Sequence, residues 1–235
     1  MFDASAAPSV QSSVFVPPGP VGSRPAFGVA AYVGLTQTVA PGESLFIEGD
    51  PADNFYEVLS GTVRLHKLLP DWRRQITGFL SAGHLLGLSH ANAYVYSAEG
   101  IGPVTVLCYP RARMDRLMDE VPGLARRLLA AASDELRQAQ DQMLLLGRKT
   151  AAEKMASFLA ALAALQGGED ADEVELPMSR NDIADYLGLT METVSRTLAK
   201  LKRDRLIALP THTRIELLDR DRLEELATGE LSAEC

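Results

Sequence analysis

Cysteine is scarce in this sequence. The 235 residues include two, Cys108 and Cys235, which lie far apart along the chain. Two cysteines cannot build a disulfide framework, or a four-cysteine metal or iron–sulfur site, within one chain. This composition leads us to expect a reduced, cytoplasmic protein.

Long apolar runs are missing as well. The longest one within a helical pattern covers residues 158–165, whereas a helix that crosses a bilayer needs roughly 18 apolar residues or more. No basic stretch precedes an apolar one near Met1, so a secretory signal is not expected. We therefore expect neither a transmembrane protein nor a membrane partner.

The common motifs of catalysis are also absent. The sequence has no Gly-x-Ser-x-Gly, P-loop or His-Glu-x-x-His motif. Gly100-Ile-Gly102 is too short for a dinucleotide fingerprint, and Asp170 and Asp172 lie in an acidic stretch without an apolar pocket to shift a pKa. No group of residues meets the criteria for an active site, so we do not expect an enzyme.

Basic residues are outnumbered by acidic ones, 23 against 31, for a net charge of −8. This total argues only weakly against a nucleic-acid partner, because binding depends on the charge of the surface that meets the phosphates. Between Met191 and Arg205 the balance reverses to five basic and two acidic residues, a local charge of +3.

The composition changes along the chain. Residues 1–28 are rich in Ala, Ser, Pro and Gly and lack periodicity, which indicates a disordered leader. Residues 29–110 contain short β-rich runs between glycine and proline turns, a pattern typical of a sandwich or barrel and not of alternating strands and helices. These runs cover residues 44–47, 55–59, 62–65, 74–80 and 105–109.

Residues 111–147 are expected to be helical. A short helix over residues 111–119 ends near Val121, because the residue before a proline avoids the helical region. Pro122 can occupy the first position of a second helix that continues to Leu146. Packing on its own domain would explain the apolar stripe of this helix, but we favour a partner helix, because a helix that links two domains has little of its own chain to cover it. The stripe, with steps of three and four, consists of Leu124, Leu128, Ala132, Leu136, Ala139, Met143 and Leu146.

Residues 148–235 begin with a helix over residues 151–165 and continue with two capped helices. Ser179 is a typical N-cap residue, and an acidic residue three positions later can complete a capping box. Gly188 permits the positive φ that ends the first helix, and Thr190 caps the second. Two helices joined by a short turn with glycine form a helix-turn-helix. The buried face of the second helix is expected to be Val194, Leu198 and Leu201.

The outward face of the second helix predicts contacts with DNA. Glu192, Ser195 and Arg196 project away from the buried stripe and lie in the part of a recognition helix that enters the major groove. Arginine can bond guanine bidentately and glutamate can accept from cytosine, so these three residues are the candidates for reading bases. An ordinary charged surface helix is the alternative, but caps, turn and alternation together favour DNA binding. Phosphate or supporting contacts are expected from Ser179, Arg180, Thr190, Met191, Thr193, Lys200, Lys202 and Arg203.

A hairpin is expected after the helix-turn-helix. Residues 206–209 and 214–218 alternate in polarity on either side of a turn that starts at Pro210. The two features together predict a winged helix.

Two stretches of sequence resemble a known family. Residues 42–50 (GESLFIEGD) and 56–63 (YEVLSGTV) resemble the cyclic-nucleotide-binding β-roll of the Crp/Fnr transcription regulators, and the long helix and winged helix-turn-helix follow in that family's order. Glu192-x-x-Ser195-Arg196 is similar to the motif of the Fnr/FixK branch, and residues 147–154 and 182–196 look closest to FixK-type regulators. The resemblance covers residues 30–225 and implies an α+β protein with a β-roll, a long dimerisation helix and a winged helix-turn-helix.

The resemblance also implies a function. It predicts a homodimeric activator that binds a TTGAT-N4-ATCAA type palindrome in double-stranded DNA and contacts RNA polymerase. By analogy, Glu192 and Arg196 read the inner bases and Ser195 contacts the outer part of each half-site.

The effector site of the family is altered here. Binding members use a Gly-Glu pair for the ribose and an Arg-Ser/Thr pair for the phosphate, but Leu88 stands where the carboxylate would be and residues 92–99 contain no arginine. A phosphate buried without a cation is costly, and the cysteine cluster of an Fnr-type iron–sulfur site is missing. We therefore expect no cofactor. The alternative is a ligand-gated regulator that binds a nucleotide, or haem through His84 or His90, in the β-roll.

Overall fold

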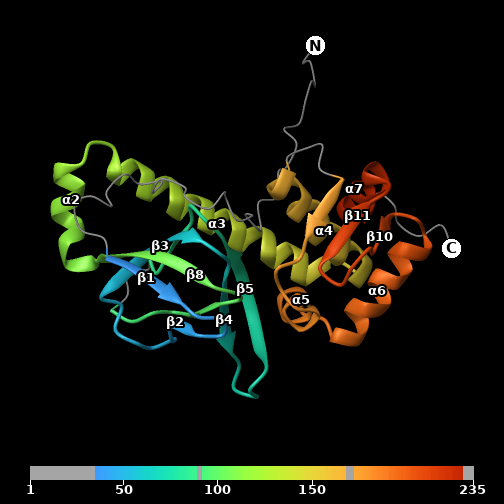
Figure 1. The fold of residues 1–235 in the computed structure, drawn as a ribbon, viewed down its shortest axis with the longest axis horizontal. Coiled ribbons are helices and arrows are strands. Elements are labelled where there is room, and N and C mark those ends of the chain that lie inside the picture. Colours follow the sequence, from blue (N-terminus) through green and yellow to red (C-terminus); the bar gives the residue numbers. More distant parts are fainter. Residues whose placement is uncertain (1–34, 89–91, 168–171, 230–235) are drawn as a thin grey trace, which may run out of the picture.

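The computed structural model describes residues 35–88, 92–167 and 172–229 (Figure 1). A β-roll lies at one end and a helical unit with a small sheet at the other, and the long helix α3 runs between them (Figure 1). The leader expected over residues 1–28 lies outside the described residues. Among the described helices, none combines the length and the apolar character needed to cross a membrane.

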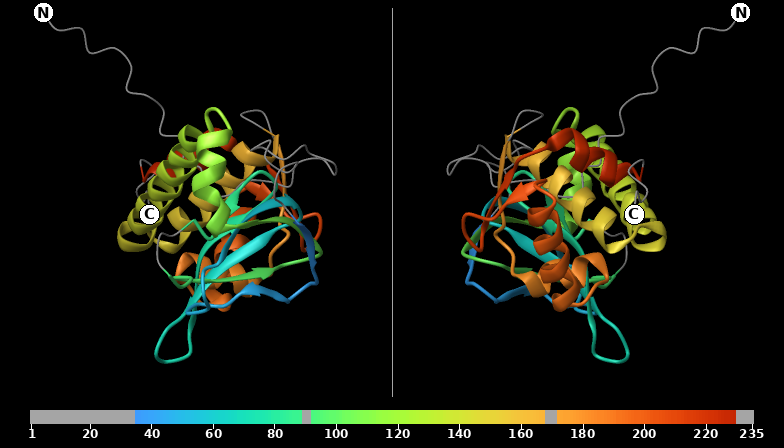
Figure 2. Two further views of the ribbon diagram at one scale, coloured as in Figure 1. Left: turned by 90° about the vertical axis from the view of Figure 1, so that its left-hand side faces the viewer. Right: turned by 90° about the vertical axis from the view of Figure 1, so that its right-hand side faces the viewer.

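The β-roll consists of two antiparallel four-stranded sheets, ordered β1-β8-β3-β6 and β2-β7-β4-β5. Its core lies between the sheets and includes Val58, Val63 and Val106, which are at most 1% exposed. The five predicted β-rich runs are confirmed as β2, β3, β4, β5 and β8. The hairpin between β4 and β5 projects from the roll (Figure 2). The strands are β1 (Leu35–Val39), β2 (Ser44–Phe46), β3 (Asn54–Ser60), β4 (Val63–Leu68), β5 (Arg74–Leu80), β6 (Leu85–Leu86), β7 (Ser97–Gly100) and β8 (Val104–Pro110).

Three helical segments follow the roll: η1 (Arg111–Arg113), α2 (Met114–Glu120) and α3 (Leu124–Arg148). The expectation that Pro122 begins the long helix was wrong, because α3 starts two residues later. Its N-cap is Gly123, whose φ of 79° reverses the chain between the helices. Glycine takes this left-handed conformation without the steric cost that a Cβ would add.

The apolar stripe of α3 divides between two environments. Leu124 is 1% exposed and packs with Phe55, Tyr109 and Leu117, so its assignment to a dimer interface is corrected: its own chain already covers it. Leu128 and Leu146 are half-buried against the β-roll and the C-terminal unit respectively. The middle of the stripe is exposed, and it comprises Ala132, Leu136, Ala139 and Met143.

The C-terminal unit packs four helices and a sheet around one core that includes Ile183, Val194 and Leu198. The sheet has the antiparallel order β10-β11-β9. The predicted hairpin is confirmed as β10 and β11, whereas β9 and α7 were not anticipated. The elements are α4 (Ala151–Gly167), β9 (Glu173–Glu175), α5 (Arg180–Leu187), α6 (Met191–Arg203), β10 (Ile207–Ala208), β11 (Arg214–Leu217) and α7 (Arg220–Thr228).

Candidate nucleic-acid interface

The first helix of the helix-turn-helix, α5, starts with the predicted capping box. The backbone N–H of Asp182 donates to Oγ of Ser179 at 3.1 Å, and the backbone N–H of Ser179 donates to Oδ2 of Asp182 at 3.1 Å. Gly188 ends the helix with a φ of 62°, as expected from its lack of a Cβ. Two N-terminal donors of α5 are thereby satisfied.

The second helix, α6, is also fixed locally. Oγ1 of Thr190 accepts from the backbone N–H of Thr193 at 3.1 Å, which confirms the N-cap. Val194, Leu198 and Leu201 are at most 2% exposed, as their spacing predicts. Since this face is anchored in the core, the opposite face must point outward.

The base-reading candidates lie together on that outward face. Glu192, Ser195 and Arg196 are all exposed. Nη2 of Arg196 lies 2.6 Å from Oε1 of Glu192, and the two side chains are 80% and 70% exposed. An exposed pair four residues apart on a helix is worth only a few tenths of a kcal/mol, about 0.3–0.5, so both groups can turn toward DNA bases at little cost.

The supporting candidates other than Arg180 divide into two groups. Met191, Lys200, Lys202 and Arg203 are exposed and can reach phosphates or groove walls. The remaining hydroxyls are used within the chain: Ser179 and Thr190 cap helices, and Thr193 Oγ1 lies 2.8 Å from Thr190 Oγ1.

Arg180 is the first residue of α5, and its side chain reaches the wing, the hairpin formed by β10 and β11. Its Nη2 donates to the carbonyl of His212 at 3.4 Å, and among the described residues nothing accepts from its buried Nη1. Burial lowers the pKa of this guanidinium from its ordinary value. The contact places Arg180 beside the turn of the wing, where it joins the two elements.

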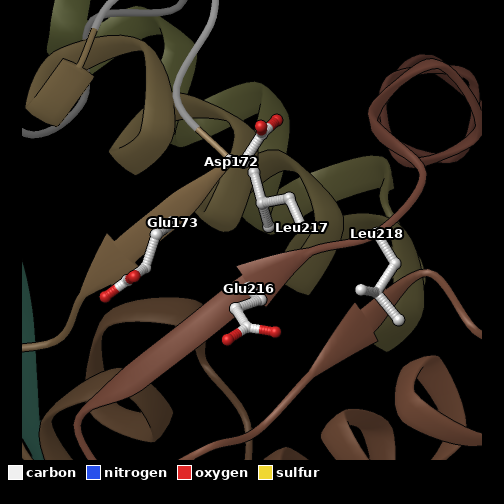
Figure 3. A pocket seen from close by; sticks show the side chains of 5 residues that line it. All are labelled: Asp172, Glu173, Glu216, Leu217 and Leu218. Carbon is white, nitrogen blue, oxygen red and sulfur yellow. The ribbon is translucent and has the colours of Figure 1, made fainter.

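A hollow beside strands β9 and β11 carries negative charge, in contrast to the basic end of α6. It is lined by Asp172, Glu173, Glu216, Leu217 and Leu218 (Figure 3). Glu173 also pairs with Arg214 on the neighbouring strand. Three carboxylates make this hollow unsuitable for phosphate, so the basic end of α6 is the better match for a DNA backbone.

The β-roll fills its own interior with aromatic rings that the sequence analysis missed. The hydroxyl of Tyr96 accepts from the backbone N–H of Gly87 at 3.1 Å, and that of Tyr94 donates to the carbonyl of Asn54 at 2.7 Å. The ring of Tyr94 stacks on Phe46 with centroids 3.7 Å apart. Burial raises the pKa of both tyrosines. The two tyrosines thereby fix the backbone at Gly87 and Asn54 and fill space in the core of the roll.

Leu88 and Arg111 complete this region. Leu88 is half-buried against the apolar cluster that joins the roll to α2 and α3, so it contributes packing where the family pattern has a carboxylate. Arg111 donates to the carbonyls of Ala52 and Gly87 at 2.7 and 2.5 Å, and it therefore binds backbone.

His66, His84 and the internal cysteine are buried or half-buried in the β-roll. Nδ1 of His84 lies 3.1 Å from the carbonyl of Ser81, and burial lowers the pKa of His84 and of His66. His90 lies outside the described residues. Burial raises the pKa of the half-buried Cys108 thiol, which disfavours the reactive thiolate.

Contacts between the β-roll and α5 were also missed. Arg64 and Arg74 bind Asp182 across the boundary between the two units. More than 100 residues of sequence separate these partners, and no local pattern marks such a pair.

Comparison with known proteins identifies both units. The model of the cyclic nucleotide-binding domain matches residues 36–121, and that of the Crp-like helix-turn-helix domain matches residues 153–226. The chain is 49% identical to the nitrogen fixation regulation protein FixK of Bradyrhizobium diazoefficiens, covering 84% of each chain. It is 48% identical to the transcriptional activatory protein AadR of Rhodopseudomonas palustris, covering 80% of each. The solved structure of FixK2 from Bradyrhizobium japonicum superposes with a TM-score of 0.77 at 39% identity, covering 83% of this chain and 97% of that one.

Proposed function

Because the chain belongs to the Crp/Fnr family of transcription regulators, we propose that it is a homodimeric activator that reads a TTGAT-N4-ATCAA type palindrome without a small-molecule effector. The observation that carries the proposal is the outward face of α6, on which Glu192, Ser195 and Arg196 are exposed together. AadR, a relative of similar length, is named as a transcriptional activator. The proposal for this chain places it in the cytoplasm, with DNA and RNA polymerase as its partners.

The proposed mechanism starts from pairing along α3. The exposed middle of the stripe (Ala132, Leu136, Ala139 and Met143) packs against the same face of a second chain. The dimer then presents two α6 helices about 34 Å apart, one turn of DNA, in successive major grooves. Glu192, Ser195 and Arg196 read each half-site, and the basic end of α6 contacts phosphates, which set affinity without sequence information.

Hydroxyl-radical footprinting tests this arrangement. We expect two protected segments, symmetric about the centre of the palindrome and about one helical turn apart. One protected segment on the intact palindrome would contradict the proposed dimer, and protection that ignores the palindrome would contradict the proposed site.

Activity without an effector has its own test. Leu88 packs in an apolar cluster where the resembling family has a carboxylate, and residues 92–99 offer no arginine to a phosphate. We expect isothermal titration calorimetry to detect no stoichiometric binding of cyclic AMP, and cyclic AMP to leave DNA affinity unchanged. One cyclic AMP bound per chain would show that this part of the proposal is wrong.

Lys202→Ala tests the phosphate contacts. Lys202 is exposed at the end of α6, and losing one phosphate contact should weaken binding to all sequences alike and reduce the slope of log K against log salt by about one unit. Binding to specific and random duplexes would be measured across salt concentrations. Arg73→Ala, which removes the same charge from the exposed hairpin between β4 and β5 instead of from α6, is the control and should keep the wild-type slope.

A further inference from the structure

A group of charged side chains joins the β-roll to the first helix of the helix-turn-helix. Arg64 on β4 and Arg74 on β5 donate to Oδ1 of Asp182 on α5, at 2.8 and 2.7 Å. Arg74 also donates from Nε to Asp185 at 2.8 Å, and Arg64 donates to Glu99 on β7 at 2.5 Å. We call these five side chains the interdomain clamp.

Asp182 connects the clamp to the helix cap. Its second oxygen, Oδ2, accepts from the backbone N–H and the hydroxyl of Ser179, at 3.1 and 2.7 Å. One carboxylate thus receives hydrogen bonds from the start of α5 and from two strands of the β-roll. The side chain of Asp182 is 4% exposed, so salt screens these pairs far less than it screens surface pairs.

Further contacts connect the β-roll to α5 on one side and to α3 on the other. Nε2 of Gln75 on β5 donates to the carbonyl of Asp185 at 2.7 Å, and the ring of Phe79 lies 5.3 Å from that of Tyr186. Because α6 follows α5 after three residues and shares its core, the two helices move together. On the other side, the roll packs on the start of α3 through the cluster that contains Leu124.

We infer that Arg64 and Arg74 are positioning residues for DNA recognition. Through Asp182 and Asp185 they hold α5, and with it α6, at one place relative to the roll and to the paired α3 helices. The dimer therefore favours one spacer length between half-sites. This inference rests on the proposed function, and it assigns the selectivity for spacing to side chains that do not touch DNA.

The test compares palindromes whose half-sites are separated by N3, N4 or N5. Arg74→Glu reverses the charge that faces Asp182 and Asp185, and it should reduce the preference for N4 over N3 and N5 by roughly tenfold, the usual size of coupling between sites. Affinity for a duplex with a single half-site should stay unchanged. A loss of folding alone would weaken every duplex equally, so the ratio isolates positioning.

The hairpin supplies a matched control. Arg73→Glu makes the same charge change one residue away, where the guanidinium pairs with Asp71 of its own hairpin, and it should keep the wild-type ratio. Combining Arg74→Glu with Asp185→Arg restores a pair of opposite charge and should recover the preference. If Arg74→Glu does not fold, Arg74→Gln removes the charge without reversing it and allows the same comparison.

The outcomes separate the two proposals. An Arg74 variant that folds and keeps the wild-type spacer ratio overturns the positioning role and leaves the proposed function standing. A wild-type protein that binds all spacers equally overturns both.

Discussion

Leu136→Glu is expected to turn the dimer into a monomer and to lower affinity for the palindrome by about 10²–10⁴-fold, the gain that linking two binding modules provides. Leu136 is 61% exposed in the single chain, so the substitution removes little packing within the fold. In a paired α3 helix it would bury a carboxylate against the same carboxylate of the partner, which is strongly unfavourable. Analytical ultracentrifugation and binding to whole and half palindromes would measure both effects.

Two alanines on α3 provide the matched comparison. Ala132 lies on the exposed stripe and Ala130 is exposed on another face of the same helix. Ala132→Glu should weaken the dimer and Ala130→Glu should not. If both variants, and Leu136→Glu with them, remain dimers, the assignment of this stripe to the interface is wrong.

Arg196→Ala is expected to lose about 1–3 kcal/mol of discrimination at the base pair that it reads, because a bidentate contact with guanine is worth that much. Helix stability should change little, since the ion pair that Arg196 makes with Glu192 is largely exposed. The measurement is a set of dissociation constants for the palindrome and for every substitution at each half-site position.

The pattern of loss identifies the role of the side chain. If Arg196 reads a base, Arg196→Ala should lose affinity for the palindrome and accept any base pair at one half-site position. Its affinity for random DNA should stay nearly unchanged. Lys202→Ala serves as the contrast, since its loss should be uniform. An equal loss of specific and random binding in Arg196→Ala would reassign Arg196 to the phosphates.

The helix-turn-helix was predictable because each of its signals is local. The box formed by Ser179 and Asp182, the left-handed Gly188 and the cap at Thr190 all depend on residues three or four positions apart. The buried stripe of α6 depends only on helical periodicity. Wherever the neighbours in sequence determine the conformation, the sequence predicts it.

The remaining features depend on partners that are distant in sequence. Strand β7, Ser97–Gly100, has few β-forming side chains and is held by pairing with β2 and β4. Helical spacing placed Leu124 on the same stripe as Leu136, but it could not indicate that the β-roll covers one and not the other. The clamp between Arg74 and Asp182 was hidden for the same reason, since only the tertiary fold brings them together.

This protein is proposed to read the palindrome directly and without an effector. The most direct test is fluorescence anisotropy of the purified protein on a labelled TTGAT-N4-ATCAA duplex, with a scrambled duplex beside it at the same salt concentration and no ligand added. We expect tight binding to the palindrome and an affinity at least about 10³-fold lower for the scramble, the lower end of the specificity of DNA-binding proteins. Weak binding that does not distinguish the two duplexes would contradict the account.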